Sequence, residues 1–313
     1  MHDCIEAMKD LYSNEADSIS HQPRRNVTVI DPDSVILTMP AFSQKLGFFA
    51  VKIVTEFKKN PERFSLPIQG GMTLLMDSRN SAILAMMDSP AVTALRTGAV
   101  SGLATSLLSR EKSRKIGLIG SGQQARAMLE AVCAVRKIES AKIYSRNPKN
   151  AIQFASEMEN KLGLPIETVA ERKIATRDAD ILNVATNSST PVLSWEEIIP
   201  GTHINSVGTL PDRQELDLET VVRSDLFVDT KQGVLTEAGD VLNAVKSGRL
   251  TPNDIKADLF QLVSNSRERP GSQDRVTLFK SVGFALQDVY ASAYVYRNLY
   301  GEKSQRTVRQ PSS

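Results

Sequence analysis

Two patterns of hydrophobic and polar positions follow each other along the chain. Between residues 22 and 88 the apolar positions fall in short runs separated by Asp-Pro, Gly or Gly-Gly turns, a pattern typical of strands. The predicted strands cover residues 27–30, 34–38, 48–56, 72–76 and 81–87. Together they predict a mostly antiparallel sheet. The residues before them predict an exposed helix that ends in a Ser-rich turn at 17–20.

A long helix is predicted directly after this sheet. Residues 88–90 (Asp-Ser-Pro) supply an N-cap followed by a proline in the first turn, which are both start signals of a helix. One apolar stripe then recurs every fourth residue, at Leu95, Ala99, Leu103 and Leu107. The stripe ends in the charged segment 109–114, where the second pattern begins.

The segment 115–145 predicts a strand–helix–strand unit. Residues 116–119 form a short apolar run suited to a buried strand, residues 125–135 carry apolar positions at helical spacing, and residues 141–144 form a second strand. A G-x-G-x-x-A turn lies between the first strand and the helix, with the sequence Gly120-Ser121-Gly122-Gln123-Gln124-Ala125.

The small residues of this turn have a physical reason. Gly120 permits the tight turn, Gly122 lets the backbone approach a pyrophosphate, and Ala125 keeps the helix close to the sheet. The free N–H groups at the start of the helix point toward the phosphate. Between a strand and a helix, the turn predicts a dinucleotide site. The alternative is a structural turn that binds no nucleotide.

The second strand of this unit bears on the choice of cofactor. In NAD-binding folds it usually ends in an acid that binds the ribose 2′-OH, but here it ends in Tyr144-Ser145-Arg146-Asn147. Arg146 and Ser145 could instead hold a 2′-phosphate, the arginine through charge-assisted bonds. We therefore predict NADP(H) in preference to NAD(H). The alternative is that Arg146 and Lys149 belong to a solvated loop.

After residue 145 strands and helices continue to alternate. Predicted strands cover 179–186, 202–207 and 225–229, and predicted helices cover 150–162, 195–199, 235–245 and 281–300. This alternation predicts a parallel, doubly wound sheet. Ligands of such sheets lie beyond the carboxyl ends of the strands, which places Thr186, Val207 and Gly208 at the cofactor edge. The last helix is apolar on more than one face and is predicted to pack on the first domain.

The composition of the chain limits the possible classes of protein, partners and compartments. A chain of 313 residues with 41% hydrophobic and 24% charged residues is ordinary for a soluble protein and has room for two domains. A net charge of +2 gives no case for nucleic acid or an anionic membrane as a partner. Two distant cysteines, Cys4 and Cys133, favour a reducing cytosol over a disulfide framework. We find no signal-peptide pattern, no apolar run of about 18 residues and no metal site.

The motifs, taken in order, resemble the ornithine cyclodeaminase and mu-crystallin family of NAD(P)-dependent proteins. The likeness extends from Pro23 to about Tyr296. The motifs that carry it are PRRNV at 23–27, LTMPAF at 37–42, VKIVTEF at 51–57, ALRTGAVSGLAT at 94–105, IGSGQQAR at 119–126, EAGD at 237–240 and DRVTLFKSVGFALQD at 274–288. The pair formed by RTGAVSGLAT and GSGQQA is the most specific.

The resemblance implies a substrate site in which basic side chains hold the carboxylate of an α-amino or α-imino acid. The matching residues are Arg25, Lys52 and Arg96, and Lys280 is implied to lie close to the same pocket. Lys52 is the candidate catalytic residue, because the pKa of a lysine falls on burial and the side chain can then exchange a proton with the substrate nitrogen. The alternatives are Arg24 in place of Arg25, a solvated Lys52 and a solvated turn residue at Lys280.

For the cofactor, the resemblance implies that Thr97 and Ser121 contact the phosphates and that Ser281 lies near the nicotinamide, with a helix N-cap as the alternative for Ser281. The complete predicted set of cofactor contacts is Thr97, Gly120, Ser121, Gly122, Gln123, Gln124, Ala125, Ser145, Arg146, Thr186, Val207, Gly208 and Ser281.

The predicted fold class is α/β. A Rossmann-type, doubly wound parallel sheet is placed at residues 113–274. A mostly antiparallel, β-rich domain for substrate binding and dimerisation is placed at 1–112 and completed by 275–313. By the same resemblance we expect a homodimer in the cytoplasm that binds a small amino or imino acid.

One segment departs from the family pattern. Cyclodeaminases of the family carry an Asp soon after the strand equivalent to INSVG, but this chain has Thr209 and Leu210 there, and Asp212 follows only after a proline. We therefore favour an NAD(P)H-dependent reductase of imino acids, or an amino-acid dehydrogenase. The alternatives are an amino-acid cyclodeaminase that releases ammonia and an NADPH-dependent binding protein.

Overall fold

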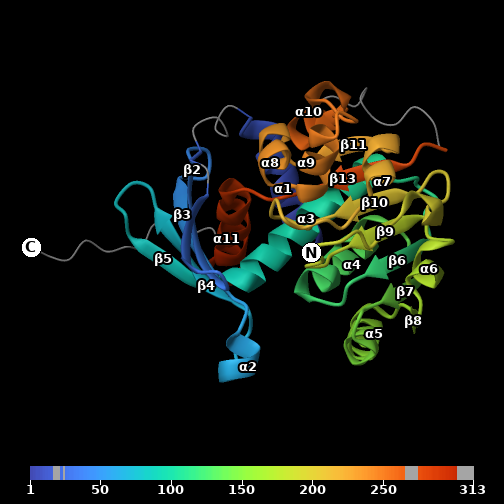
Figure 1. Cartoon of the computed structure of the whole chain (residues 1–313). Helices are drawn as coiled ribbons and strands as arrows, with labels where there is room; N and C mark the ends of the chain where they lie inside the picture. The colour runs from blue at the N-terminus through green and yellow to red at the C-terminus, as the bar shows by residue number, and fades with distance from the viewer. Residues whose placement is uncertain (17–21, 24, 265–273, 302–313) are drawn as a thin grey trace, which may run out of the picture. The chain divides into compact units, whose positions relative to one another are not determined.

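The computed structural model describes residues 1–16, 22–23, 25–264 and 274–301, and the chain divides into two compact units (Figure 1). The parallel-sheet unit comprises Met1–Ser13 and Thr97–Gly283. The antiparallel-sheet unit comprises Asn14–Arg96 and the segment that begins at Phe284. The boundaries fall between Ser13 and Asn14, inside helix α3 (Ser89–Leu108) and before Phe284, whereas the boundaries predicted from the sequence are 112/113 and 274/275.

In the antiparallel-sheet unit, the residues that the structure describes form a five-stranded sheet in the order β1-β2-β3-β4-β5, and every neighbouring pair is antiparallel. Their bounds are β1 (Asn26–Asp31), β2 (Ser34–Ser43), β3 (Phe48–Phe57), β4 (Gln69–Asp77) and β5 (Ile83–Asp88), with a short helix α2 (Asn60–Phe64) between β3 and β4. Helix α11 (Ala285–Tyr300) packs against β2, β3, β4 and β5 (Figure 1). The predicted antiparallel sheet and the predicted packing of the last helix on it are both confirmed.

The two faces of this sheet differ in exposure. Side chains alternate along β3, so that Phe48, Ala50 and Lys52 are buried on one face. On the opposite face the strands expose large apolar side chains, among them Phe42 at 52%, Met72 at 40%, Ile83 at 62% and Met86 at 66%. We call the residues Phe42, Met72, Ile83 and Met86 the outer sheet face.

The described residues of the parallel-sheet unit form an eight-stranded sheet, all strands paired in parallel, in the order β12-β11-β13-β10-β9-β6-β7-β8. Their bounds are β6 (Lys115–Ile119), β7 (Ser140–Tyr144), β8 (Ile166–Thr168), β9 (Ile181–Val184), β10 (His203–Ser206), β11 (Asp225–Val228), β12 (Ala257–Asp258) and β13 (Thr277–Lys280). The strand order reverses between β6 and β9, which is the switch point where such sheets bind ligands. The predicted doubly wound sheet is confirmed.

Helices connect these strands. They are α4 (Gln123–Val135), α5 (Pro148–Leu162), α6 (Arg172–Thr176), α7 (Leu218–Arg223), α8 (Lys231–Glu237), α9 (Gly239–Lys246) and α10 (Leu259–Ser264). The prediction of one helix over 235–245 is wrong, because the chain turns at Ala238 between α8 and α9. At this turn Gly239 lies so close to other backbone that an added Cβ would stand 2.1 Å from the carbonyl oxygen of Arg213.

Two further expectations need correction. A helix at the N-terminus is present, α1 (His2–Asn14), but it is not exposed, because Cys4, Ile5, Met8, Leu11 and Tyr12 form a buried stripe at helical spacing. The predicted turn at 17–20 lies outside the described residues. The last helix begins at Ala285 rather than at 281, since 277–280 is strand β13.

Helix α3 is the longest apolar element. By length and composition alone it could cross a membrane, with a mean hydropathy of 1.2 over its best window, although the sequence analysis finds no such run. In the structure 72% of that window is buried, as is typical of a core helix. Gly98 lets α4 approach closely, since an added Cβ would lie 2.6 Å from the carbonyl oxygen of Ala127.

Candidate active site

The glycine-rich turn joins β6 to α4 at the switch point. Gly120 has a φ of +104°, and an added Cβ would lie 2.2 Å from the carbonyl oxygen of Ala185, in the loop after β9. Only glycine combines this backbone conformation with this close approach. The turn is therefore held against the loop after the neighbouring strand, where the strand order reverses.

The space in front of α4 fits a pyrophosphate. Gly122 is the N-cap of α4 and offers no side-chain cap, and an added Cβ would meet no atom within 4 Å. The first N–H groups of a helix have no partner inside the helix, so they can donate to an anion. Gln124 Oε1 is buried without a hydrogen-bond partner, and Ala125 is fully buried beneath the turn. These residues fit the diphosphate of a dinucleotide.

The ends of β6 and β7 place Ser121 and Ser145 together, with their hydroxyl oxygens 2.9 Å apart. Arg146 and Lys149 follow and are exposed. Asn147 accepts a hydrogen bond from the Lys149 N–H and so caps α5, which explains why that helix begins at Pro148. The structure therefore presents a serine and an arginine where an NAD-binding fold usually presents an acid.

The remaining predicted cofactor residues lie at or near the carboxyl ends of strands, apart from Thr97, which is buried in α3. Thr186, Val207 and Ser281 follow β9, β10 and β13, which are neighbours in the sheet. The hydroxyl of Ser281 donates to Asp229 at 2.8 Å, and the N-cap of α11 is Phe284, so Ser281 is not the helix cap.

The backbone N–H groups of Thr186 and Gly208 have protein partners. Both donate to the carboxylate of Glu215, a residue for which the sequence analysis assigned no role. Any contact of these two residues with a cofactor must therefore use other atoms.

A second group of predicted residues meets inside the antiparallel-sheet unit. Lys52 points from the buried face of β3 to Asp288 of α11, with Nζ 2.9 Å from Oδ1. Nε of Arg96 lies 3.3 Å from the same carboxylate oxygen, and another guanidinium nitrogen donates to Gln287 at 2.8 Å. Lys52, Arg96 and Asp288 are all buried. We call Lys52, Arg96, Gln287 and Asp288 the Lys52 cluster.

The charges in the Lys52 cluster do not balance. Burial lowers the pKa of Lys52 from 10.5 to about 8; Asp288 opposes this fall, while Arg96 and Arg25 add to it. Within the cluster, two cations, Lys52 and Arg96, thus share one carboxylate. Oδ2 of Asp288 is buried without a hydrogen-bond partner. A cation excess in a buried place favours an anionic ligand. Arg24, the alternative to Arg25, lies outside the described residues.

Gln287 and Asp288 were not predicted as site residues, although both lie in the motif at 274–288. The signal in the sequence was a Gln-Asp pair within a predicted helix that is apolar on more than one face. The structure buries residues 276–293 without interruption, so such a pair needs polar partners.

Lys280 does not join the Lys52 cluster. It is the last residue of β13 in the other unit, where its ammonium donates to Ser206 at 2.8 Å and to Asp240 at 3.0 Å. It is only 1% exposed, so the alternative of a solvated turn residue is wrong. No group of three or more His, Cys, Asp or Glu side chains suited to a metal occurs in the part of the chain that the structure describes.

The departing segment after β10 also has a defined conformation. Leu210 has a φ of +90°, which is strained for a residue with a side chain, and Asp212 is exposed. Backbone strain of this kind often occurs at functional sites.

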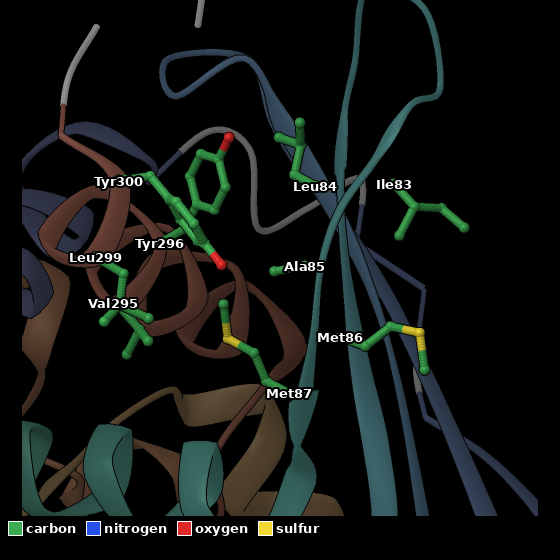
Figure 2. Close-up of a pocket in the computed structure, with 9 residues that line it drawn as sticks. All are labelled: Ile83, Leu84, Ala85, Met86, Met87, Val295, Tyr296, Leu299 and Tyr300. Carbon is green, nitrogen blue, oxygen red and sulfur yellow. The ribbon is translucent and has the colours of Figure 1, made fainter. Parts of the chain in front are cut away.

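A pocket of about 390 Å³ lies elsewhere in the antiparallel-sheet unit, between β5 and the C-terminal part of α11. Figure 2 shows Ala85 and Met87 pointing toward the helix, while Ile83 and Met86 point away from it. Tyr296 is eight positions beyond Asp288, or about 12 Å along the helix at 1.5 Å per residue. None of the side chains that line the pocket is charged, and it lies apart from the Lys52 cluster, so we do not assign a substrate carboxylate to it.

Comparisons with known proteins agree with this geometry. The sequence model of the ornithine cyclodeaminase/mu-crystallin family matches residues 1–303. A Delta(1)-pyrroline-2-carboxylate reductase of Bacillus cereus is 34% identical over 275 residues, which cover 87% of this chain and 84% of the relative.

Two solved structures have the same fold over nearly the whole chain. The Delta(1)-pyrroline-2-carboxylate reductase of Thermococcus litoralis, in complex with NADH and L-proline, is 40% identical with a TM-score of 0.88 and covers 95% of this chain and 93% of its own. An archaeal alanine dehydrogenase dimer with bound NAD is 29% identical with a TM-score of 0.87, and the match covers 97% of this chain and 93% of the dehydrogenase chain.

Proposed function

The chain belongs to the ornithine cyclodeaminase/mu-crystallin family, and from this premise we propose that it is an NAD(P)H-dependent reductase of α-imino acids. The nearest chemical precedent is the reduction of Δ1-pyrroline-2-carboxylate, because relatives that are 34% and 40% identical bear the name of that reductase. The reverse reaction, oxidation of an α-amino acid, uses the same groups.

The cation excess of the Lys52 cluster carries this proposal. An α-imino acid has a carboxylate next to its C=N carbon, and Arg96 offers a planar fork that matches a carboxylate. Gln287 and Asp288 hold the Arg96 guanidinium on two sides, so its orientation is fixed before a substrate arrives. Arg25 adds positive charge to the same place.

Lys52 is the proposed proton donor. With a pKa of about 8, its ammonium is the main form at neutral pH and still gives up a proton readily. Reduction of the C=N bond requires one hydride at carbon and one proton at nitrogen. The nicotinamide cofactor, when bound, supplies the hydride. Lys52 supplies the proton to the imine nitrogen, and Asp288 positions Lys52 and favours its charged form.

For the cofactor we propose a preference for NADPH over NADH. The support is the sequence Ser145-Arg146 after β7, where an exposed guanidinium and a hydroxyl can bind a 2′-phosphate. The reductase of Thermococcus litoralis holds NADH in its structure, so the preference proposed here rests on the residues of this chain.

We also propose a cytosolic homodimer. The outer sheet face exposes Phe42, Met72, Ile83 and Met86, and a contiguous apolar surface of this kind marks an interface. The archaeal alanine dehydrogenase with the same fold is described as a dimer. Cys4 and Cys133 are free thiols, which suits a reducing compartment.

A cofactor assay tests the proposed activity. Purified protein is mixed with NADPH or NADH, and the absorbance of the reduced nicotinamide is followed while Δ1-pyrroline-2-carboxylate, pyruvate with ammonia, or glyoxylate with ammonia is added. We expect consumption of NADPH with an imine. Ammonia released from L-ornithine without net change of cofactor would identify a cyclodeaminase instead. Tight NADPH binding without turnover of any of these substrates would identify a binding protein.

A further inference from the structure

Three neighbouring strand ends of the parallel sheet share one buried cluster. Lys280 is the last residue of β13, Ser206 is the last residue of β10, and Thr186 lies two residues beyond β9. These strands are consecutive in the order β13-β10-β9. Glu215 and Asp240 complete the cluster, and both are buried. We call Thr186, Ser206, Glu215, Asp240 and Lys280 the Glu215 cluster.

Glu215 binds the ends of two strands at once. Its Oε1 accepts from the backbone N–H of Thr186 and, at 3.0 Å, from the Thr186 hydroxyl. Its Oε2 accepts from the Gly208 N–H and from the Ser206 hydroxyl, each at 2.7 Å. Gly208 leaves room for this carboxylate, since an added Cβ would lie 2.6 Å from Cδ of Glu215. The side chain thus fixes the backbone after both β9 and β10.

Lys280 is the counter-ion of this arrangement. Its ammonium donates to Asp240 and to Ser206, and Ser206 passes its own hydrogen bond on to Glu215. Nζ also lies 3.8 Å from Oε2 of Glu215. Burial raises the pKa of Glu215, and Lys280 and the N–H and O–H donors oppose that rise. One cation already faces two carboxylates, so a substrate carboxylate at Lys280 would be a third anion in the same buried place.

We propose that Glu215 is a positioning residue for the cofactor, and that Lys280 and Asp240 serve Glu215 rather than the substrate. The carboxyl end of β9 borders the switch point, where a doubly wound sheet binds its dinucleotide, and β10 is the next strand of the sheet. Hydride transfer tolerates little misplacement of the reacting atoms. A carboxylate that locks the Thr186 and Gly208 backbone sets the shape of that edge. The inference rests on the proposed hydride-transfer function but is testable without turnover.

The test measures NADPH affinity in the absence of any substrate. Glu215→Gln keeps the size of the side chain but replaces one carboxylate oxygen with an amide NH₂ group. This donor would face N–H or O–H groups that donate hydrogen bonds to Glu215 in the wild type. We expect the Kd for NADPH to rise about tenfold or more, which corresponds to about 1.4 kcal/mol for a factor of ten. The matched control is Glu197→Gln. Glu197 is a buried glutamate of the same unit that pairs with Arg172 instead of the strand ends. The Kd of this control variant for NADPH is expected to equal that of the wild type.

A second variant tests whether Lys280 supports Glu215 or binds the substrate. The double variant K280Q/D240N removes opposite charges together, so that the remaining charge balance is kept. We expect it to raise the Kd for NADPH while the KM for an imino acid stays within about twofold of the wild type. A higher KM for the imino acid at unchanged NADPH affinity would instead make Lys280 a substrate ligand.

Two results would overturn the proposal. One is NADPH binding by Glu215→Gln with wild-type affinity. The other is a loss that follows only from unfolding, with the folded fraction of the variant binding as tightly as the wild type. If the wild type binds NADPH but reduces no imino acid, the proposed function fails, while the affinity comparison still decides the role of Glu215.

Discussion

Two buried lysines of this protein have opposite surroundings. Lys52 shares a single carboxylate, Asp288, with Arg96, so cations are in excess. Lys280 faces two carboxylates, Asp240 and Glu215, so anions are in excess. Both side chains are nearly inaccessible, at 2% and 1% exposure. Burial and residue type therefore do not distinguish them, but the local charge balance does.

The difference in local charge supports the proposed assignment of Lys52, and not Lys280, to the substrate. The anion excess of the Glu215 cluster is compensated internally, since backbone N–H groups of Thr186 and Gly208 donate to Glu215. In the Lys52 cluster, Lys52 and Arg96 share the carboxylate of Asp288. In the proposed function the carboxylate of the substrate adds a second negative charge there. A lysine predicted to bind substrate can thus be tested against the charges around it.

The largest expected effect is on turnover after Lys52→Met. Loss of a positioned proton donor lowers kcat by about 10²- to 10⁴-fold. Stability should change little, because Asp288 keeps Arg96 as a partner. Steady-state rates with an imino acid and NADPH measure the effect, and Lys58→Met, at an exposed lysine of the same unit, is the control. Turnover close to that of the wild type would remove Lys52 from the chemistry.

The substitution of methionine for Lys280 should lower the stability of the folded protein. Lys280→Met leaves two buried carboxylates without their ammonium, and breaking a buried ion pair typically costs about 3–5 kcal/mol. Denaturant unfolding of the two lysine variants measures the contrast. If Lys52→Met proves as destabilising as Lys280→Met, the charge-balance distinction between the clusters is wrong.

A third cation extends the comparison to the surface. Arg146 is exposed, two residues beyond the end of β7. Arg146→Ala should raise the KM for NADPH about 10- to 100-fold, since a hydrogen bond to a charged group contributes about 1.5–3 kcal/mol. The KM for NADH should stay nearly constant and serves as the internal control. An equal change for both cofactors would argue against a 2′-phosphate contact.

The smallest effect is a shift of pH dependence in Asp288→Asn. Asp288 opposes the fall in the pKa of Lys52, so its neutralisation lowers that pKa below about 8. The proton donor is active when protonated, and the wild-type rate of imine reduction should fall as the pH rises through about 8. The groups that face Lys52 are Asp288, Arg96 and Arg25.

In the variant the same decline should occur at lower pH. A profile of kcat against pH for both proteins measures it, and a profile that does not move would show that Asp288 has no influence on the proton donor. The free energy of unfolding of the wild type should change with pH in the direction opposite to the rate. The unfolded chain binds more protons than the folded one between about 8 and 10.5, so unfolding becomes harder as the pH rises through that window.

Local patterns allowed much of the fold to be predicted. The strand–turn–helix at 115–135 follows from glycine spacing and helical periodicity within one short segment. The position of β13 could not be predicted in this way. It lies between β10 and β11 in the sheet although it follows both in sequence, because strand order depends on contacts between distant segments.

The partners of the candidate site residues could not be predicted from local patterns either. Lys52 and Arg96 were found through their motifs, but the partner of Lys52 is 236 residues away in the sequence. The family resemblance placed Lys280 near the substrate, and its partners Asp240 and Ser206, 40 and 74 residues away, were not apparent in the sequence. A buried polar residue is visible in a sequence, whereas the partner that compensates it depends on the tertiary fold.

The most direct test is the initial rate of NADPH oxidation with Δ1-pyrroline-2-carboxylate, measured for the wild type and for Lys52→Met. We expect measurable turnover by the wild type and a loss of about 10²-fold or more in the variant, at similar stability. NADPH binding by the wild type without oxidation by this or any other α-imino acid would contradict it.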